Sequence, residues 1–485
     1  MTLTVVKVGG ALLDGPSDLD AVVQALATRR RRGERLLVVV SAVKGVTDTL
    51  EAAAVDALDP RSGAEMTRAL VDQLHSRHVQ LVAGRPGAHG VLLGLRVALD
   101  GVDRLLTGIR LTGELTERTH DLLLAHGERL SAPLLAEALR IGGVDARAVT
   151  SEEAGLVAHG PFRVGGCDVE ASRSGLAGLL HEMHDRILVL TGFYGVNTDG
   201  DVVLFGRGGT DYTAGVVAAG LGADALELWK DVPGFMSADP QLLTGARLVP
   251  ELSFAEACEL GYYGARILHP RCLEPLRGGK QEISFRSVHN VDAVGTRIVE
   301  QRLGDAATVA ALAHRTGVAV VRVEGSAMVN RPGVAGRVFS ELGRAGVNID
   351  AVASSMTSLS FTIEDDQVSM VRRVLRLMQE EEGGVIERIE VRREVVLIGV
   401  VGDGVASDPT VAARMLSCLE HLGEPVELIS HGPGDVGLSC AVPESGKQRI
   451  LSLLHAEFFG EAAAGKKTPL AEFESARDED RERDS

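Results

Sequence analysis

A glycine-rich segment, residues 204–214 (LFGRGGTDYTA), holds the residues best suited to chemistry in this chain. Its three glycines let backbone N–H groups approach a ligand closely. Arg207 can bind a carboxylate or phosphate through two hydrogen bonds, and Asp211 places an acid nearby. An apolar run precedes the segment at residues 187–190, and apolar residues at helical spacing follow it. A glycine-rich turn alone is more often a simple connection, but the arginine and aspartate favour binding of a small anionic substrate beside a phosphate donor.

A second group of candidate residues lies at the start of the chain. Residues 3–8 are an apolar run that contains Lys7 and is followed by Gly9 and Gly10. A strand that ends in two glycines presents backbone amides to phosphate groups. Lys7 could supply positive charge to a transferring phosphoryl group. A lysine at a strand end with its ammonium group in water fits these residues equally well.

Two further segments carry polar residues at expected ligand-facing positions. The apolar run 36–40 leads into the sequence SAVKGVTD (residues 41–48), and the carboxyl end of a parallel strand is where open α/β sheets bind ligands. Residues 121–139 predict a helix with a break at Pro133. Glu128 in this helix follows a glycine and could face a ligand amine, or it could be an ordinary exposed glutamate.

These segments belong to a longer alternation of strands and helices. The alternation continues to about residue 303 and predicts an α/β domain with a mainly parallel sheet, residues 1–303. After a junction at residues 304–315, two βαββαβ-like units follow, at 316–390 and 391–460, and form an internal repeat. Residues 461–485 are charged and poor in large apolar side chains, which predicts a disordered tail.

Composition excludes several classes of function. The net charge of −17 argues against binding of a nucleic-acid backbone, and 3% aromatic residues leave few platforms for base stacking. The basic run 29–32 is better explained as a solvated cap that complements a helix dipole. Five scattered cysteines without a C-x-x-C pair predict buried free thiols. No apolar stretch is long and uninterrupted enough for a membrane span. The start of the chain has no basic segment leading an apolar one, as a signal peptide would, so we expect a soluble, cytoplasmic protein without membrane partners.

Several motifs follow one another in a recognisable order. They are residues 7–10 (KVGG), 40–42 and 45–47 (VSA and GVT), 126–128 (HGE), 206–212 (GRGGTDY), 229–234 (WKDVPG), 239–240 (DP) and 264–270 (GARILHP). With the repeats behind them, the chain resembles aspartate kinase (aspartokinase), of the amino acid kinase family with C-terminal ACT domains, over residues 3–459. The resemblance implies an α/β fold, with a three-layer sandwich around a mainly parallel sheet and then two ferredoxin-like ACT domains.

The resemblance also implies an activity. Members phosphorylate the β-carboxylate of L-aspartate with ATP and Mg²⁺, giving 4-phospho-L-aspartate in the first step of aspartate-family amino acid biosynthesis. Feedback through the ACT domains by lysine or threonine, and assembly as a homodimer or higher homo-oligomer through them, are implied as well. An ACT pair that only dimerises the enzyme is the alternative.

Site residues are carried over position by position. Lys7 and Asp211 are the implied catalytic pair, Arg207 binds a substrate carboxylate, and Glu128 lies near the substrate amine. The other implied substrate positions are Ser41, Ala42, Thr47, Phe193, Gly208, Gly209 and Thr210. The implied nucleotide positions are Lys7, Gly9, Gly10, Lys230, Asp231, Met236, Asp239, Gln241 and Arg266. The implied effector positions are Met328, Arg331, Gly333, Val334, Asn348, Asp350, Ser354 and Ser355, and no metal-ligating residue is implied.

The chain departs from the family pattern mainly on the nucleotide side. Ala11 and Leu12 stand where Thr-Ser is usual, and Lys230, Met236, Gln241 and Arg266 replace the usual Thr or Ser, Tyr, Arg and Lys. Two alternatives therefore stay open. One is an amino-acid sensor whose kinase domain binds without turnover, and the other is a kinase for a different acid such as an N-acylated glutamate.

Overall fold

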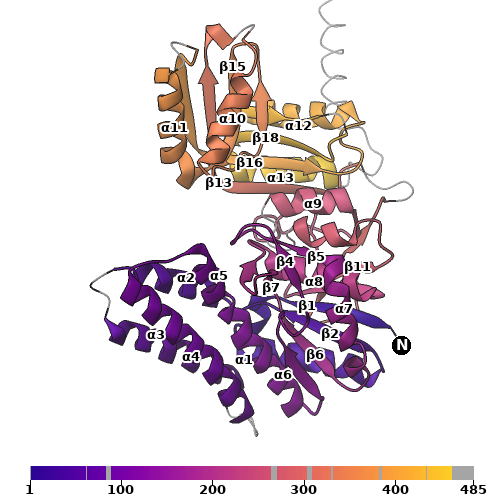
Figure 1. Ribbon diagram of the computed structural model, residues 1–485. Coiled ribbons are helices and arrows are strands. Elements are labelled where there is room, and N and C mark those ends of the chain that lie inside the picture. The colour runs from indigo at the N-terminus through magenta and orange to yellow at the C-terminus, as the bar shows by residue number, and fades with distance from the viewer. Residues whose placement is uncertain are drawn as a thin grey trace, which may run out of the picture. The chain divides into compact units, whose positions relative to one another are not determined.

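The computed structural model describes residues 2–59, 61, 63–83, 89–263, 270–302, 308–328, 331–381, 385–432 and 434–460 (Figure 1). The chain divides into two compact units. The first comprises Met1–Phe235, Pro250–Phe254 and Arg266–Gln301, and the second comprises Met236–Val249, Ala255–Ala265 and Arg302–Ser485. Residues 461–485, for which a disordered tail is predicted, lie outside the described residues.

An eight-stranded sheet forms the centre of the first unit, in the order β10-β12-β11-β9-β1-β2-β6-β3. Neighbouring strands are parallel except β11 and β12, which are antiparallel. The mainly parallel sheet expected from the sequence is therefore confirmed. The strands are β1 (Leu3–Val8), β2 (Arg35–Val40), β3 (Ala146–Val149), β6 (Ile187–Thr191), β9 (Ala225–Lys230), β10 (Glu251–Ser253), β11 (Glu282–Ser287) and β12 (Arg297–Val299).

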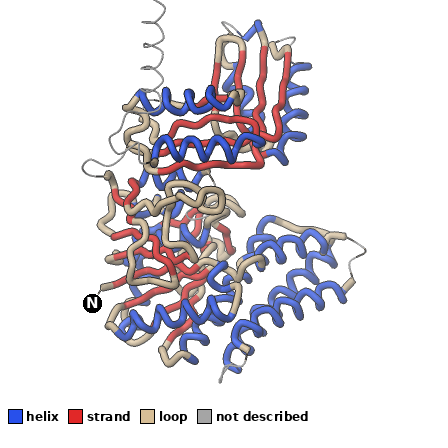
Figure 2. The backbone as a smooth tube through the Cα atoms, turned by 180° about the vertical axis from the view of Figure 1, so that it is seen from behind, coloured by secondary structure: helices blue, strands red, loops and turns tan. Residues whose placement is uncertain are grey.

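Helices cover both faces of this sheet, as its apolar strands require (Figure 2). Val6 and Val8 of β1 join a core that also contains Leu19 and Leu130 of α1 and α6. Lys7 lies between these valines in the sequence, so its side chain points to the opposite face, where α8 packs. The helices are α1 (Pro16–Arg31), α2 (Val46–Asp56), α3 (Ala64–Val82), α4 (His89–Thr112), α5 (Glu117–Leu124), α6 (His126–Ile141), α7 (Val169–Leu179) and α8 (Gly209–Leu221).

A smaller sheet in the first unit has the order β5-β4-β7-β8. Its strands are β4 (Val157–His159), β5 (Gly166–Asp168), β7 (Tyr194–Val196) and β8 (Val202–Leu204). Strand β8 leads directly into the glycine-rich segment, so this sheet positions the start of that segment.

The predicted break at Pro133 is wrong. Pro133 lies inside α6, and the chain is interrupted instead at Ala125, between α5 and α6. The imidazole Nδ1 of His126 lies 2.8 Å from the carbonyl oxygen of Leu122. This contact occupies a carbonyl in the last turn of α5, where helices leave such groups without backbone partners.

The second unit contains one six-stranded sheet in the order β14-β15-β13-β16-β18-β17. Its strands are β13 (Ala311–Glu324), β14 (Val352–Ser354), β15 (Ser358–Glu364), β16 (Arg388–Val401), β17 (Leu428–Ser430) and β18 (Gly437–Pro443). Its helices are α9 (Phe254–Tyr262), α10 (Val334–Arg344), α11 (Val368–Glu381), α12 (Pro409–Leu422) and α13 (Lys447–Phe459). The two predicted repeats are present, but they share their long central strands.

The sharing follows from the register of β13 and β16. Residues 318–324 pair with β15 and with the first half of β16, which completes the first repeat. Residues 311–315 pair with residues 397–401, where the second repeat needs a fourth strand. The interpretation of residues 304–315 as a plain junction is therefore wrong for Ala311–Arg315. Both strands change conformation where the halves meet, with positive φ at Gly317 (71°) and Glu394 (57°).

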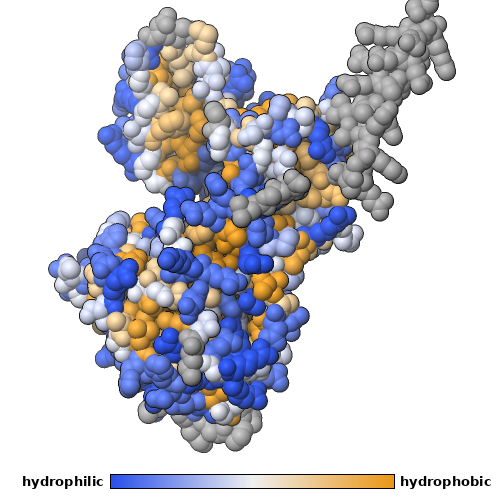
Figure 3. All heavy atoms as spheres, turned by 90° about the vertical axis from the view of Figure 1, so that its right-hand side faces the viewer, coloured by the Kyte–Doolittle hydropathy of each residue, from blue (hydrophilic) through white to orange (hydrophobic). Residues whose placement is uncertain are grey.

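Each repeat keeps its own hydrophobic core. The first core includes Val321, Phe361 and Leu375, and the second includes Leu312, Ile398 and Leu454. Figure 3 shows a broad apolar area on one face of this unit. No helix in the described part of the chain combines the length and hydropathy that a membrane crossing demands.

Candidate active site

Four neighbouring parallel strands, β9, β1, β2 and β6, end at one edge of the central sheet. Because parallel strands share a direction, the residues that follow them gather at this edge. Gly9 and Gly10 follow β1, and Ser41 and Ala42 follow β2. Gly192 and Phe193 follow β6, and Asp231 follows β9. The edge therefore collects residues from across the first unit.

The centre of the site is a buried ion pair between Lys7 and Asp211. Lys7 Nζ lies 2.7 Å from Asp211 Oδ1, and the two side chains are only 6% and 10% exposed. Asp211 lies in the first turn of α8, where the helix dipole favours a negative charge. A Cβ atom added to Gly9 would lie 3.4 Å from Lys7 Nζ, so this glycine leaves the ammonium group approachable from the backbone side. Asp211 therefore holds the ammonium group of Lys7 in a fixed position at the strand edge.

Glu128 is a buried acid with one unused oxygen. Its Oε1 accepts a hydrogen bond from the Ala42 amide at 2.9 Å, whereas Oε2 has no hydrogen-bond partner among the described residues. Burial raises the pKa of Glu128 to about 8, although the Ala42 amide and Lys7 oppose the shift. A buried carboxyl group with an open oxygen can accept a hydrogen bond from a ligand ammonium group.

Close packing brings Glu128 to the end of β2. A Cβ atom on Gly127 would lie 2.7 Å from the Ala42 Cβ and 3.7 Å from Thr47 Oγ1, so only glycine lets α6 come this near. Ser131 Oγ also donates a 2.8 Å hydrogen bond to the carbonyl oxygen of Ser41. The predicted residues Ser41, Ala42, Thr47 and Glu128 therefore lie together.

The glycine-rich segment lies against the end of β6. Gly208 has φ 73° and caps α8, and a Cβ atom on Gly209 would lie 2.8 Å from the Phe193 ring. Phe193 itself has φ 78°, which is rare for a residue with a side chain and marks a constrained turn. Thr210 is buried against Gly192. Arg207 is exposed, so its guanidinium is accessible to a ligand.

The predicted nucleotide residues divide between the units. Burial, assisted by repulsion from Lys7, lowers the pKa of Lys230 to about 8. Met236, Asp239 and Gln241 belong to the second compact unit, where Asp239 Oδ1 accepts the Gln241 amide at 2.8 Å. Arg266 lies outside the described residues.

The predicted effector residues all lie in the second unit. Gly333 precedes α10 as its N-cap residue with φ 91°, and Ser355 Oγ lies 2.7 Å from Ser358 Oγ. Asp350 Oδ2 is 3.2 Å from Arg315 Nη1, and Asn348 Nδ2 donates to Asp350 Oδ1 at 2.9 Å. An amine ligand of Asp350 would therefore meet a carboxylate that already contacts an internal cation. The other predicted residues lie before and in the first turn of α10 (Met328, Arg331, Val334) and at the end of β14 (Ser354).

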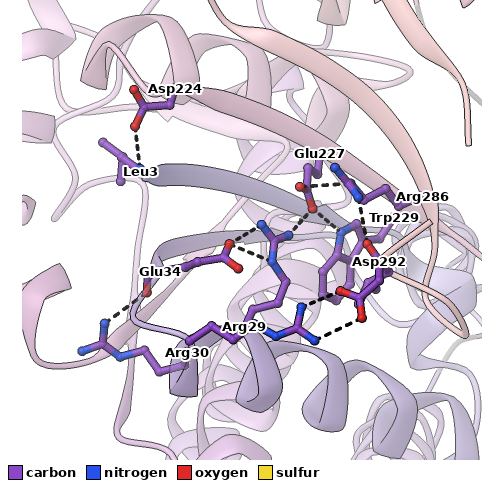
Figure 4. Close-up of polar contacts among 11 residues, drawn as sticks. Leu3, Arg29, Arg30, Glu34, Asp224, Glu227, Trp229, Arg286 and Asp292 are labelled. Atoms are coloured by element: carbon purple, nitrogen blue, oxygen red, sulfur yellow. Dashed lines mark hydrogen bonds and ion pairs between the residues drawn. The ribbon is translucent and has the colours of Figure 1, made fainter. Parts of the chain in front are cut away.

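Sequence reasoning missed a buried charge cluster that fixes α1 to the sheet (Figure 4). Glu227 of β9 accepts hydrogen bonds from Arg29 and from Trp229 Nε1, the latter at 2.9 Å, and its other oxygen lies 3.0 Å from Arg286 Nε. The prediction of a solvated basic run is wrong for Arg29, which is 8% exposed. The signal was Glu227 itself, an acid inside an apolar strand, which requires a buried counter-charge. Arg32 of the same run does stay exposed, beside Asp292.

Two further residues that the sequence did not single out hold the glycine-rich segment. Asp121 of α5 is fully buried and accepts the Leu204 amide at 2.9 Å. Arg271 donates to the Phe205 carbonyl oxygen at 2.6 Å. The only sequence signal for Asp121 is an acid directly before an apolar run on a helix, and Arg271 has none.

Comparison with known proteins agrees with this architecture. The model of the amino acid kinase family matches residues 2–287, and that of an ACT domain matches residues 321–377 and 398–458. Over 468 residues the chain is 30% identical to "Aspartokinase 1, chloroplastic" of Arabidopsis thaliana, which covers 94% of this chain and 80% of that protein. It is 28% identical to the "Bifunctional aspartokinase/homoserine dehydrogenase" of Haemophilus influenzae, of which the match covers only 56%.

Solved structures show the same fold. Escherichia coli aspartokinase III in complex with aspartate and ADP superposes with a TM-score of 0.79 at 23% identity, covering 94% of this chain and 99% of that one. The same enzyme in complex with lysine and aspartate gives 0.77 at 24% identity, with the same coverage. At these identities the likeness concerns the arrangement of the backbone.

Proposed function

Since the chain belongs to the aspartokinase group of the amino acid kinase family, we propose that it transfers the γ-phosphoryl group of ATP to the β-carboxylate of L-aspartate. The products are 4-phospho-L-aspartate and ADP. The observation that carries this proposal is the Lys7–Asp211 pair at the strand edge that also holds Glu128. It combines a fixed cation for a phosphoryl group with a buried acid for the amine of an amino acid.

The chemistry requires positioning rather than a strong base. A carboxylate oxygen of aspartate attacks the γ-phosphorus, and the bond from that phosphorus to the bridging β,γ-oxygen breaks as ADP leaves. Two anions must meet, so the barrier falls when fixed positive charge neutralises the transferring group. Lys7 supplies that charge, and Asp211 holds its ammonium group in place.

The ends of the amino acid are recognised separately. Glu128 Oε2 accepts the α-ammonium group, and Arg207 binds the α-carboxylate through two hydrogen bonds. Phe193, Gly208, Gly209 and Thr210 line the turn beside Arg207. A kinase for an N-acylated acid would present an amide instead of an ammonium group to Glu128, and the buried carboxyl favours the free amine.

In the first unit, we propose that the Gly9 and Gly10 amides, Lys230 and Asp231 face the nucleotide. Met236, Asp239, Gln241 and Arg266 stay predictions from the family resemblance. Among the described residues, no group of three or more His, Cys, Asp or Glu side chains could hold a metal ion. Mg²⁺ would be held by the nucleotide phosphates and water with at most one or two protein carboxylates, which is its usual mode in kinases. Its chemistry there is to neutralise charge on the β- and γ-phosphates.

We assign regulation to the second unit, by lysine or threonine bound near Met328 to Val334 and Asn348 to Ser355. Its sheet ends at strands β14 and β17, where Val352 and Ile429 are 38% and 41% exposed. Open sheet edges with apolar side chains suit association of two copies, so we also propose a homodimer or larger homo-oligomer. The reaction is then the first step of aspartate-family amino acid biosynthesis in the cytoplasm, under feedback control.

The test is an assay of ADP release with Mg-ATP and L-aspartate, with hydroxylamine to trap the acyl phosphate as its hydroxamate. Hydroxamate that depends on aspartate is the expected result, and lysine and threonine are added in parallel to identify an inhibitor. N-acetylglutamate serves as the competing substrate. Folded protein that gives no hydroxamate, yet is stabilised by an amino acid, would replace the proposal with an amino-acid sensor.

A further inference from the structure

Two backbone segments lie side by side next to the exposed Arg207. They are residues 163–165 and residues 204–206, called here the paired segments. The Gly165 amide donates a 2.8 Å hydrogen bond to the Leu204 carbonyl oxygen. A Cβ atom on Gly206 would lie 3.1 Å from the Arg163 carbonyl oxygen, and Gly206 has φ 73°. Arg207 follows Gly206 directly, so the position of its backbone is set by this pairing.

Asp121 binds the amides of both segments. Its Oδ2 accepts the Arg163 amide at 2.8 Å and the Leu204 amide at 2.9 Å, and the residue is fully buried. Hydrogen bonds to a carboxylate are about twice as strong as those between neutral groups. Arg163 has φ 71°, a strained conformation that persists only where the surroundings enforce it. Asp121 therefore enforces a backbone shape that the chain would otherwise leave.

Arg271 binds the carbonyl groups of the same two segments. Its Nη1 donates to Phe205 at 2.6 Å and its Nη2 donates to Gly165 at 2.8 Å. The guanidinium group lies 4.6 Å from the centre of the Tyr212 ring, and Tyr212 belongs to the first turn of α8. One arginine thus links the paired segments to the helix that carries Asp211.

We infer that Asp121 and Arg271 are positioning residues that set Arg207 for its substrate. An anion fixes the amides and a cation fixes the carbonyl groups, so the segment before Arg207 is held through both kinds of backbone group. Neither side chain needs to touch the substrate. The inference rests on the proposed function, because it takes Arg207 as the ligand of the substrate α-carboxylate.

Loss of either residue lets Arg207 move away from the α-carboxylate, and displacement by about 1 Å can reduce catalytic efficiency about 100-fold. The effect falls on aspartate more than on ATP, because the paired segments adjoin Arg207, whereas Lys7 lies in strand β1 and Gly9 and Gly10 follow it. If Asp121 and Arg271 only stabilised the fold, their loss would lower the melting temperature without changing KM for aspartate more than KM for ATP.

The experiment measures KM for L-aspartate, KM for ATP, kcat and melting temperature for Arg271→Met and Asp121→Ala. We expect KM for aspartate to rise about 10- to 100-fold, with KM for ATP within about twofold of the wild type. Arg32→Met is the matched control, because Arg32 is exposed and pairs with Asp292 elsewhere in the same unit. Arg271→Lys and Asp121→Asn keep part of the hydrogen bonding, so we expect them to raise KM for aspartate less than Arg271→Met and Asp121→Ala do, but still more than they raise KM for ATP.

If Arg271→Met or Asp121→Ala fails to fold, the two conservative variants and their double variant carry the test. Their effects should be less than additive in free energy, because both residues hold the same segments. Equal changes in both KM values, or an unchanged KM for aspartate in folded variants, would overturn the inference.

Failure of the proposed function gives a different pattern. Wild-type protein that binds L-aspartate in calorimetry without forming hydroxamate rejects the kinase activity alone, and the dissociation constant for aspartate then replaces KM. Wild-type protein that neither binds nor phosphorylates aspartate overturns both proposals.

Discussion

The two units of this chain bring distant residues together in different ways. In the first, neighbouring parallel strands end at one edge, and each strand contributes its own residues to the site. In the second unit, the long strands β13 and β16 each belong to both repeats. The early part of β13, residues 311–315, supplies the strand that completes the second repeat. A local sequence pattern is therefore informative in the first unit, because each strand and the site residues that follow it are neighbours in the sequence. In the second unit the pattern shows two repeats without showing which segment closes each of them.

The strongest test of the first arrangement is Lys7→Ala. Loss of the fixed charge should reduce kcat about 1,000-fold in the hydroxamate assay, because a preorganised charge at the transferring group provides several kcal/mol. Lys280→Ala removes an exposed lysine of the same unit and should leave kcat unchanged. Retained turnover in folded Lys7→Ala protein would show that the strand edge is not organised around this ammonium group.

The second arrangement is tested by Leu312→Ala. Leu312 lies in the early half of β13 but belongs to the core of the second repeat, with Ile398 and Val400. The substitution should lower the free energy of unfolding of this unit by about 2–4 kcal/mol, measured by urea denaturation. It should also speed hydrogen exchange in residues 397–401. Leu377→Ala is the control, since that side chain is 55% exposed and should change stability by less than about 0.5 kcal/mol. Exchange that stays slow would contradict the shared-strand arrangement.

Arg207→Ala should affect the binding of aspartate and leave the binding of ATP almost unchanged. The variant loses a charge-assisted pair of hydrogen bonds to aspartate, so KM for aspartate should rise about 10- to 100-fold. KM for ATP should stay within about twofold. A larger effect on ATP would mean that Arg207 belongs to the nucleotide side of the edge.

The smallest expected effect is the number of protons released when aspartate binds. With its pKa raised to about 8, Glu128 is mostly protonated at pH 7, and an ammonium ligand favours the ionised form. Aspartate binding should therefore release about one proton at pH 7 and fewer above pH 8, which calorimetry in buffers of different ionisation enthalpy can count. Glu128→Gln should abolish the release. Unchanged proton release in that variant would assign it to another group.

For Lys230 we predict proton uptake on ligand binding, the opposite of the proton release predicted for Glu128. Its pKa is lowered to about 8, and bound phosphates favour its charged form, so nucleotide binding should take up protons near pH 8–9.

The raised pKa of Glu128 also makes the stability of the fold depend on pH. Glu128 binds its proton more tightly in the folded state, so its contribution to stability is present at low pH and is lost as pH rises from about 4.5 to about 8.

The sequence predicted features that depend on local pattern. Apolar runs gave the strands that precede Lys7 and Ser41, and the two ACT-like repeats were visible from the order of their elements. Residues whose meaning depends on a distant partner were not visible. In the sequence Arg29 resembles a surface residue, and only the fold shows that it pairs with Glu227. Likewise, only the fold shows that Asp121 accepts hydrogen bonds from the Arg163 and Leu204 amides. Alternation and spacing carry no information about such pairings.

The pairing of Ala311–Arg315 with residues 397–401 also has a consequence for synthesis on the ribosome. The early segment emerges first and must wait for its partner, which is made about 80 residues later. At typical elongation rates of about 5–20 residues per second, the delay is roughly 4–16 s. During that interval the first repeat can fold between the two segments while one edge of β13 remains unpaired. A nascent chain at this stage presents an open strand edge, and a chaperone that shields it would improve the yield of folded protein.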